Sequence, residues 1–176
     1  MINVKNIEFG GNKPFILIAG PCVVENSAVT NETASSLKKI CADLDIPFVF
    51  KASYRKANRT SINSFMGLGD MMALKILKDA GERYDVPLIT DVHTAEDCRN
   101  AANYVDILQI PAFLCRQTDL LLAAGETGKA VNIKKGQFLA PWDMKHAAAK
   151  VARSGNEKIL LTERGTTFGY GNLVVD

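Results

Sequence analysis

Residues 88–98, Leu-Ile-Thr-Asp-Val-His-Thr-Ala-Glu-Asp-Cys, contain a complete transition from a strand to a helix. The run 88–92 is almost continuously apolar, which is typical of a strand buried on both faces of a parallel sheet. Thr94, with Asp97 three residues later, has the spacing of a capping box and predicts the start of a helix. Asp91 stands at the end of the strand. The segment therefore predicts one βα unit with a carboxylate at its junction.

The same unit recurs in both directions along the chain. Predicted strands cover residues 15–19, 48–52, 88–92, 107–111, 130–134 and 158–163. Apolar residues at helical spacing fill two of the gaps: Leu37, Ile40, Cys41 and Leu44 in one, and Leu74, Leu77, Ala80 and Tyr84 in the next. Asp143 can cap a later helix and Gly155 can end it. This repeat predicts an α/β fold.

Two α/β architectures fit the spacing, because the strands begin about 29 residues apart and a (β/α)8 barrel has roughly 31 residues per unit. A doubly wound sheet would fit as well. A group able to bind or react ends almost every strand: Cys22, Lys51, Asp91, Gln109, Lys134 and Arg164. Barrel enzymes build their active sites at that end, and no GxGxxG follows the first strand. We therefore expect a (β/α)8 TIM barrel.

Six strands do not close an eight-stranded barrel. We expect residues 1–176 to form a single barrel domain that supplies about the first six βα units and is truncated before the seventh and eighth strands. An open parallel sheet of this kind would expose unpaired strand edges.

Composition excludes several classes of protein. The chain is 47% hydrophobic and 23% charged, as in ordinary globular proteins, and its net charge of +2 gives no support to nucleic-acid binding. The longest apolar stretch, residues 15–24, is about half the length of a membrane helix of ~20 residues. The N-terminus is a poor signal peptide, and no CxxC pair occurs among the four cysteines. We expect a cytoplasmic protein with reduced thiols and no membrane partner.

Cations gather where an anion would bind. Residues 50–61 carry Lys51, Arg55, Lys56 and Arg59, with Asn58, Thr60 and Ser61 as neutral hydrogen-bonding neighbours. Lysine and arginine both bind phosphate, so the segment suits a phosphorylated or carboxylated substrate. A solvated basic loop is the alternative. Further cations end two later strands, and strand alternation points only one of Lys134 and Lys135 inward.

Other reactive side chains carry weaker signals. A lone cysteine such as Cys22 is more often inert packing than a metal ligand, although a thiolate ligand would favour zinc or iron-like metals. Neither His93 nor His146 has a metal-ligand spacing with its neighbours. No phosphate-binding P-loop, nucleophile elbow or catalytic dyad is recognisable.

Seven runs, in order along the chain, resemble the family of 3-deoxy-D-manno-octulosonate 8-phosphate synthases. They are Ile-Ala-Gly-Pro-Cys (18–22), Phe-Lys-Ala-Ser (50–53), Lys-Ala-Asn-Arg-Thr-Ser (56–61), Ile-Thr-Asp-Val-His (89–93), Gln-Ile-Pro-Ala-Phe-Leu-Cys-Arg-Gln-Thr-Asp-Leu (109–120), Asn-Ile-Lys-Lys-Gly-Gln-Phe (132–138) and Glu-Arg-Gly-Thr-Thr-Phe-Gly-Tyr (163–170). The resemblance implies a (β/α)8 barrel that condenses phosphoenolpyruvate with arabinose 5-phosphate in lipopolysaccharide biosynthesis. In this family C3 of phosphoenolpyruvate attacks the aldehyde, water adds at C2, and phosphate leaves by C–O cleavage.

The resemblance also implies a role for each matching residue. It places Lys51 and Lys56 at the phosphoenolpyruvate carboxylate, and Lys56, Asp91 and Asn58 at the reacting centre. The phosphoenolpyruvate phosphate would be held by Gln109, the backbone of Ala112, Lys134 and Arg164, and arabinose 5-phosphate by Asn58, Arg59 and Thr60. Of the two lysines at 134 and 135, the resemblance selects Lys134. Arg116 would reach a phosphate in a neighbouring subunit, which implies a homotetramer.

Cysteine at position 22 resembles the metal-dependent class of this family, whereas asparagine there marks the metal-independent class. The resemblance therefore implies Cys22 as a ligand of a divalent metal, with zinc, iron and manganese all compatible. The family's other ligands are a histidine, a glutamate and an aspartate of the seventh and eighth strands. One thiolate cannot make a site that needs three or more ligands, so we expect a metal site in these 176 residues to be incomplete.

Four residues depart from what is usual in the family: Arg55 replaces an aspartate, Thr60 a serine, Asn63 a histidine and Met66 an arginine. Arg55 changes the net charge of the loop by two units, which could tighten anion binding or alter the accepted sugar phosphate.

Two alternatives to this function stay open. The related heptulosonate synthase takes erythrose 4-phosphate, but its loop reads Lys-Pro-Arg-Thr-Ser, so Ala57 and Asn58 argue against it. The other is an inactive fragment that binds phosphate without turnover.

Overall fold

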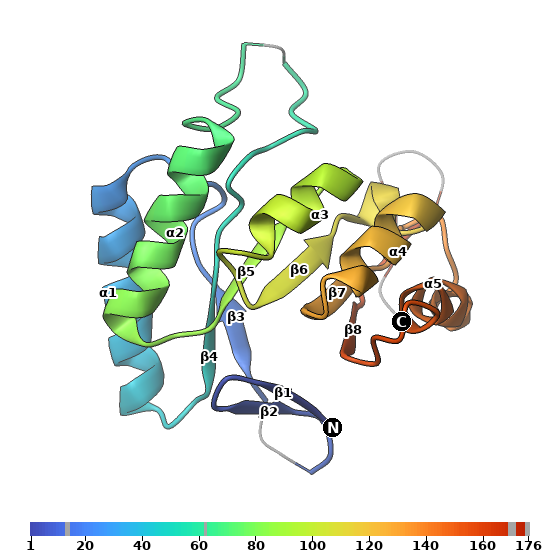
Figure 1. Cartoon of the computed structure of the whole chain (residues 1–176), viewed down its shortest axis with the longest axis horizontal. Coiled ribbons are helices and arrows are strands. Elements are labelled where there is room, and N and C mark those ends of the chain that lie inside the picture. Colours follow the sequence, from blue (N-terminus) through green and yellow to red (C-terminus); the bar gives the residue numbers. More distant parts are fainter. Residues whose placement is uncertain (13–14, 62, 169–171, 175–176) are drawn as a thin grey trace. The chain divides into compact units, whose positions relative to one another are not determined.

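The computed structural model describes residues 1–12, 15–61, 63–168 and 172–174 (Figure 1). In chain order the strands are β1 (Ile2–Val4), β2 (Ile7–Phe9), β3 (Leu17–Ala19), β4 (Phe48–Lys51), β5 (Leu88–Asp91), β6 (Ile107–Ile110), β7 (Ala130–Lys134), β8 (Ile159–Thr162), β9 (Thr166–Phe168) and β10 (Asn172–Val174). The α-helices are α1 (Ser27–Asp43), α2 (Asp70–Tyr84), α3 (Ala95–Ala101), α4 (Thr118–Glu126) and α5 (Met144–Ala152).

The strand order identifies the architecture. Strands β3 to β8 form one six-stranded sheet whose order is the order of the sequence. The pairs β3–β4, β4–β5 and β7–β8 are parallel. An uninterrupted order of this kind is that of a (β/α)8 barrel, whereas a doubly wound sheet reverses its order at a switch point. The predicted barrel class is therefore confirmed, and the described residues supply six strands of the sheet with the five α-helices between them.

All six predicted strands are present, and most are shorter than predicted by one or two residues. Strand β6 ends at Ile110 because Pro111 cannot donate a ladder hydrogen bond. The three-residue strands β1, β2, β9 and β10 were not predicted, since runs this short carry no readable period.

The predicted capping box at the start of α3 is confirmed. Asp97 donates its backbone N–H to Thr94 Oγ1 at 3.1 Å, and Asp97 Oδ2 accepts from Thr94 N at 3.1 Å. At the later helix, Asp143 occupies the N-cap position of α5 but makes no capping hydrogen bond with its side chain. That helix ends at Ala152, and Gly155 follows with a left-handed φ of 84°.

The apolar face predicted for α1 is partly wrong. The helix buries Cys41 together with Thr30 and Ala34, and it leaves Ile40 50% exposed. Leu44 is 63% exposed because it lies beyond the last helical residue. Helix α2, in contrast, buries the predicted residues Leu74, Leu77 and Ala80.

The chain divides into two compact units. Unit 1 comprises Met1–Asp91 and Asn103–Ile107, and unit 2 comprises Val92–Ala102 and Leu108–Asp176. In unit 1, α1 and α2 lie side by side, and they pack on β4 and β5 respectively. The β1–β2 hairpin lies at the amino ends of β3 and β4, whereas the loop from β4 to α2 extends beyond the carboxyl end of β4 (Figure 1).

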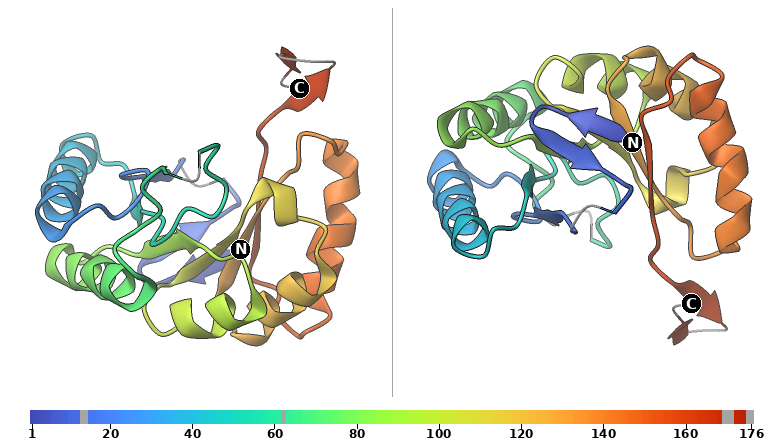
Figure 2. Two further views of the ribbon diagram at one scale, coloured as in Figure 1. Left: turned by 90° about the horizontal axis from the view of Figure 1, so that it is seen from above. Right: turned by 90° about the horizontal axis from the view of Figure 1, so that it is seen from below.

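In unit 2, α4 packs against both α3 and α5. Strands β9 and β10 pair as an antiparallel hairpin. Figure 2 shows this hairpin, in dark red, standing apart from the helices of its unit. Within the described part of the chain, no helix combines the length and the apolar character that crossing a membrane requires.

Candidate functional site

Two predicted site residues end neighbouring strands of unit 1. Lys51 is the last residue of β4 and Asp91 the last of β5. The Nζ atoms of Lys51 and Lys56 lie 3.9 and 3.6 Å from Asp91 Oδ2. All three side chains are largely buried, and the carboxylate reduces the repulsion between the two ammonium groups. The cluster therefore carries an excess positive charge at the carboxyl end of the strands.

Sequence reasoning missed Ser53, which joins these groups. The fully buried Ser53 hydroxyl donates to Asp91 Oδ2 at 2.5 Å and accepts from Lys56 Nζ at 2.8 Å. Its backbone is held by a parallel bridge to Val23. A usable signal existed, because residues 51 and 53 fall on one side of an extended segment. Lys51, Ser53, Lys56 and Asp91 are called the lysine–aspartate cluster below.

The three residues predicted for the sugar phosphate lie further along the same loop. Asn58, Arg59 and Thr60 are exposed. The loop is closed at its base, where the backbone N–H of Lys56 donates to the carbonyl of Met66 at 2.8 Å. It therefore begins at the cluster and presents these three side chains to solvent.

Arg55, the departure from the family pattern, is engaged outside the cluster. Its Nη1 lies 3.0 Å from Asp70 Oδ2, at the first residue of α2. Its guanidinium also lies 5.6 Å from the centroid of the Tyr54 ring. Asp70 thus offsets the added cation locally, although a partly exposed ion pair of this kind contributes only about 0–1 kcal/mol.

Cys22 lies just after β3, and its neighbour Val23 forms the bridge to Ser53 of the cluster. Its thiol is free and exposed, and the following segment is held where Val24 N–H donates to the Ser53 carbonyl at 2.9 Å. Across the described ranges, no group of three or more histidine, cysteine, aspartate or glutamate side chains is placed to hold a metal ion. The accessible Cys22 sulfur fits a metal as a single donor, but the described residues do not form a complete metal site.

In unit 2, hydrogen bonds link side chains of three neighbouring strands, Gln109 among them. Thr162 Oγ1 on β8 donates to Asn132 Oδ1 on β7 at 2.8 Å. Asn132 Nδ2 in turn donates to Gln109 Oε1 on β6 at 3.0 Å. Gln109 and Asn132 are buried. The side chain of a predicted phosphate ligand is therefore fixed by its neighbours.

The two lysines that end β7 have different environments. Lys135 is only 2% exposed, and its Nζ donates to the carbonyls of Gly165 at 2.8 Å and Leu139 at 3.0 Å. Lys134 is partly exposed. Lys134 is therefore the one of the two that a solute can reach, whereas Lys135 ties together the segments that follow β7 and β8.

The turn that carries Arg164 is built by its neighbours. Glu163 Oε1 accepts from the backbone N–H groups of Arg164 at 2.8 Å and Gly165 at 2.5 Å, and lies 3.4 Å from Lys135 Nζ. Partial desolvation by itself would raise the pKa of Glu163. The hydrogen bonds from Gly165 and Arg164 and the Lys135 ammonium outweigh it, so this pKa lies below its usual value. Gly165 supplies the left-handed φ of 77° that the turn needs.

Two further predicted residues follow β6. Ala112 is buried at the start of the 3-10 helix η1 (Ala112–Leu114). Arg116 is exposed, and its backbone carbonyl accepts from Lys150 Nζ of α5 at 2.8 Å. The segment is therefore anchored while the Arg116 side chain remains at the surface.

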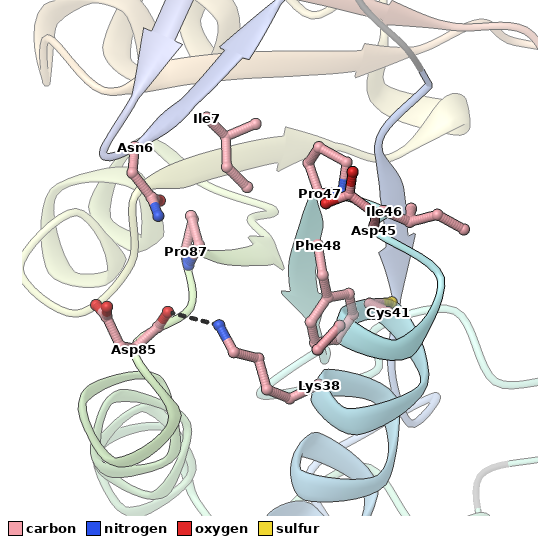
Figure 3. A pocket seen from close by; sticks show the side chains of 11 residues that line it. Asn6, Ile7, Lys38, Cys41, Asp45, Ile46, Pro47, Phe48, Asp85 and Pro87 are labelled. Carbon is pink, nitrogen blue, oxygen red and sulfur yellow. Dashed lines mark hydrogen bonds between the residues drawn. The ribbon is translucent and has the colours of Figure 1, made fainter.

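A cavity of about 280 Å³ lies at the other end of the unit 1 strands (Figure 3). It is lined by residues that include Ile7 of the amino-terminal hairpin, Cys41 of α1 and Phe48, the first residue of β4. Lys38 Nζ donates to the Asp85 carbonyl at 3.5 Å beside it. Its lining includes none of the predicted site residues, so this cavity is distinct from the lysine–aspartate cluster.

Parallel strands in sequence order, with helices between them, define a protein of the (β/α)8-barrel class. The more specific assignment comes from comparison with known proteins. The family model described as "DAHP synthetase I family" matches residues 1–176. The chain belongs to this family.

Individual relatives share more than half of their aligned residues with the chain. A protein of Granulibacter bethesdensis is 59% identical over 176 residues, one of Fusobacterium nucleatum 59% over 175, and one of Geotalea uraniireducens 57% over 175. Each is named 2-dehydro-3-deoxyphosphooctonate aldolase. The alignments cover 99–100% of this chain but only 62, 63 and 64% of these relatives, respectively.

Proposed function

We propose that the protein carrying this chain condenses phosphoenolpyruvate with D-arabinose 5-phosphate and water. The products are 3-deoxy-D-manno-octulosonate 8-phosphate and phosphate, as in lipopolysaccharide biosynthesis. The observation that carries the proposal is the approach of Lys51 and Lys56 to a single Asp91 oxygen, at 3.9 and 3.6 Å. The names of relatives at 57–59% identity support the same reaction.

The lysine–aspartate cluster suits the carbon–carbon bond-forming step. Lys51 and Lys56 would neutralise the carboxylate of phosphoenolpyruvate, and so reduce the repulsion that keeps two anionic substrates apart. C3 of phosphoenolpyruvate attacks the aldehyde carbon, and the aldehyde oxygen takes a proton. Lys56, which donates to Ser53 while Ser53 donates to Asp91, is our candidate for placing that proton, with Asp91 as its partner.

The second step removes phosphate from C2. Water adds at C2, its oxygen becomes the keto oxygen, and the bond from C2 to the phosphate oxygen breaks. Gln109, the Ala112 N–H, Lys134 and Arg164 would hold the departing phosphate. Lysine acts there as a compact charge and arginine as a planar fork. The turn built by Glu163 and Gly165 supports this role for Arg164.

Asn58, Arg59 and Thr60 would bind the phosphate of the sugar. Their exposure on a loop closed at its base suits a substrate that enters from solvent. Arg55 faces Asp70, so we propose that its charge has little effect on which sugar phosphate is accepted.

The test is the release of phosphate from phosphoenolpyruvate by the purified protein, with arabinose 5-phosphate or erythrose 4-phosphate as acceptor. We expect turnover with arabinose 5-phosphate, and ¹⁸O in the bridging position of phosphoenolpyruvate should appear in phosphate. Lys56→Met should abolish turnover. Lys39→Met, at an exposed lysine paired with Asp43 on α1, should leave it unchanged.

Two other outcomes would contradict the proposal. Preference for erythrose 4-phosphate would favour a heptulosonate synthase, the second candidate, which the description of the family model supports. Binding of phosphoenolpyruvate by calorimetry without phosphate release would favour a phosphate-binding protein that lacks turnover.

We further propose Cys22 as one ligand of a divalent metal, zinc, iron or manganese. Its exposed thiol supports this role, and the other ligands would belong to the part of the relatives that this chain does not span. Binding of cobalt should give a thiolate-to-cobalt absorption band that Cys22→Ser loses. A band of unchanged intensity in Cys22→Ser would exclude Cys22 as a metal ligand.

We also propose a cytoplasmic homotetramer in which Arg116 reaches a neighbouring subunit.

A further inference from the structure

We infer that Lys135 and Glu163 are positioning residues, which hold the turn around Arg164 in its phosphate-binding conformation before phosphoenolpyruvate arrives. The inference rests on the proposed function, because that function makes Arg164 a phosphate ligand. It is carried by the hydrogen bonds that converge on Lys135 Nζ and Glu163 Oε1 from the backbone of this turn. It gives Lys135 a role in the reaction without contact with the substrate.

Arg164 lies in a short connection that is fixed on both sides. Before it, the Thr162 carbonyl accepts from the backbone N–H of Lys135 at 2.9 Å. After it, the backbone N–H of Thr167 donates to the Gln137 carbonyl at 3.0 Å. Both bonds join the segment that follows β8 to the segment that follows β7. The groups that hold the residues between these two bonds therefore decide the conformation at Arg164.

Two side chains hold these residues. The backbone N–H groups of Arg164 and Gly165 both donate to Glu163 Oε1, at 2.8 and 2.5 Å. Lys135 Nζ donates to the Gly165 carbonyl at 2.8 Å and lies 3.4 Å from Glu163 Oε1. Each bond has only one possible direction, because N–H and ammonium groups donate and carbonyl and carboxylate oxygens accept. Three consecutive peptide groups, beginning with the one before Arg164, are therefore fixed.

Packing alone does not require a charge at Lys135. The residue is 2% exposed, and its ammonium also donates to the Leu139 carbonyl at 3.0 Å. Removing an ammonium group from water is costly, and a well-packed apolar side chain of similar volume is often as stable in such a place. A methionine could fill the space, but it could not hold the Gly165 carbonyl. The charge therefore serves the conformation of the turn.

A fixed turn favours phosphate binding. The Arg164 guanidinium binds phosphate as a planar fork, which requires a defined orientation. A site that adopts its binding conformation only part of the time loses affinity in proportion to that fraction. A turn in this conformation about one tenth of the time would bind phosphate about tenfold more weakly. The contribution of Lys135 and Glu163 should therefore appear in the affinity for phosphate.

Glu163→Gln distinguishes positioning from a simple effect of charge, because the two predict opposite signs. Removing a carboxylate beside a phosphate ligand reduces repulsion and by itself would tighten anion binding. If Glu163 holds the turn, its neutral replacement should loosen it, and phosphate affinity should fall about two- to fivefold. Phosphoenolpyruvate and inorganic phosphate are titrated by calorimetry into the full protein, with no sugar present. Glu157→Gln, at an exposed glutamate before β8, should change neither affinity.

A double-mutant cycle tests whether Lys135 acts through Arg164. We expect Lys135→Met to weaken phosphate binding about 5- to 20-fold and Arg164→Met about 10- to 100-fold. The double variant should bind no more weakly than Arg164→Met, because Lys135 then has nothing left to position. Lys158→Met is the matched control, since this exposed lysine before β8 donates to the Gly128 carbonyl at 3.4 Å. It removes the same charge and should not change phosphate affinity.

Hydrogen exchange observes the turn without any activity. In Lys135→Met the backbone N–H groups of Arg164 and Gly165 should exchange several-fold faster than in wild type, and saturating phosphate should slow them again. In steady-state assays this variant should raise the KM for phosphoenolpyruvate and leave that for arabinose 5-phosphate unchanged. A general loss of stability would not produce this difference between the two substrates.

The outcomes distinguish the inference from the proposed function. A wild-type protein that binds neither phosphoenolpyruvate nor phosphate would overturn the proposed function, and this inference with it. Wild-type binding together with unchanged or tighter phosphate binding in Glu163→Gln would overturn the inference alone. So would losses that multiply in the double variant. Weaker binding in Glu163→Gln would support the inference even if Lys135→Met failed to fold, and coupled losses in the cycle would support it further.

Discussion

The Ser53 hydroxyl is the neutral group that links the charged side chains of the lysine–aspartate cluster. It donates to Asp91 and accepts from Lys56, so Ser53→Ala removes two hydrogen bonds to charged partners in a buried place. We expect this variant to lose about 1–3 kcal/mol of unfolding free energy in urea titrations. Phosphate release should also fall because Lys56 loses its alignment. Ser35→Ala, at an exposed position of α1, should change neither quantity, and equal stability of the two variants would contradict the assigned network.

The four thiols should differ sharply in reactivity. Burial, with Asp97 nearby, raises the pKa of Cys98 to about 12, and burial raises the pKa of Cys41 as well. At pH 8 only about one Cys98 in 10,000 is then a thiolate, which is the reactive form. Cys22 is exposed. We expect one fast reaction with a disulfide reagent under native conditions and its loss in Cys22→Ser; a fast phase that persists in that variant would show another accessible thiol.

Glu163 stabilises the turn between β8 and β9, and its contribution to the free energy of unfolding should depend on pH. Its pKa is lowered in the folded protein, so its contribution is present above the pKa of the unfolded chain and is lost as pH falls through the folded value. The pKa of a glutamate in an unfolded chain is about 4.3. Glu163→Gln should therefore unfold at a lower temperature than wild type at pH 7, and this difference should narrow at acidic pH below about 4.3.

Melting curves followed by circular dichroism between pH 7 and pH 3 measure this effect. Glu157→Gln is the control, because Glu157 is exposed in the segment before β8. It should follow the wild type throughout. A difference between wild type and Glu163→Gln that stays constant over the whole range would mean that the charge of Glu163 does not stabilise the turn.

The elements were predictable where the signal is local. Continuous apolar runs identified the six strands of the parallel sheet, and Thr94 with Asp97 identified the start of α3, because both patterns depend on residues adjacent in sequence. Ile40 was assigned to the wrong face of α1, since periodicity alone does not determine how the helix is rotated against its sheet. The exposure of Leu44 followed from where the helix ends.

The site was predictable only in part, for a related reason. Lys51 and Asp91 could be anticipated because they end strands. Ser53 left only the weak signal that it lies on the same side of an extended segment as Lys51, and its contact with Asp91 joins residues 38 positions apart. Lys135 left no such signal, because it reaches the Gly165 carbonyl, 30 positions away in the chain. Sequence alone left the choice between Lys134 and Lys135 open, and the burial of Lys135 against the Gly165 carbonyl now separates them. Long-range contacts of this kind have no local signature.

The assembly of the whole molecule can be tested through Arg116. Its side chain is exposed and its backbone is anchored to α5 by Lys150, so Arg116→Ala should fold normally. If Arg116 acts in a neighbouring subunit, Arg116→Ala and Lys56→Met should each be inactive alone. Subunits of the two variants, mixed and reassembled, should then recover activity. A site formed by an Arg116→Ala subunit has its own Lys56 and receives Arg116 from a Lys56→Met neighbour.

Random mixing in equal amounts pairs subunits in this way at about one quarter of the sites, if each site takes Arg116 from one neighbour. We therefore expect up to about a quarter of wild-type phosphate release after reassembly, and none before it. Sedimentation should give the mass of a tetramer for all three proteins. Reassembled mixtures that stay inactive, although their mass is that of the wild type, would mean that Arg116 serves its own subunit. The tetramer would then have no part in forming the site through this residue.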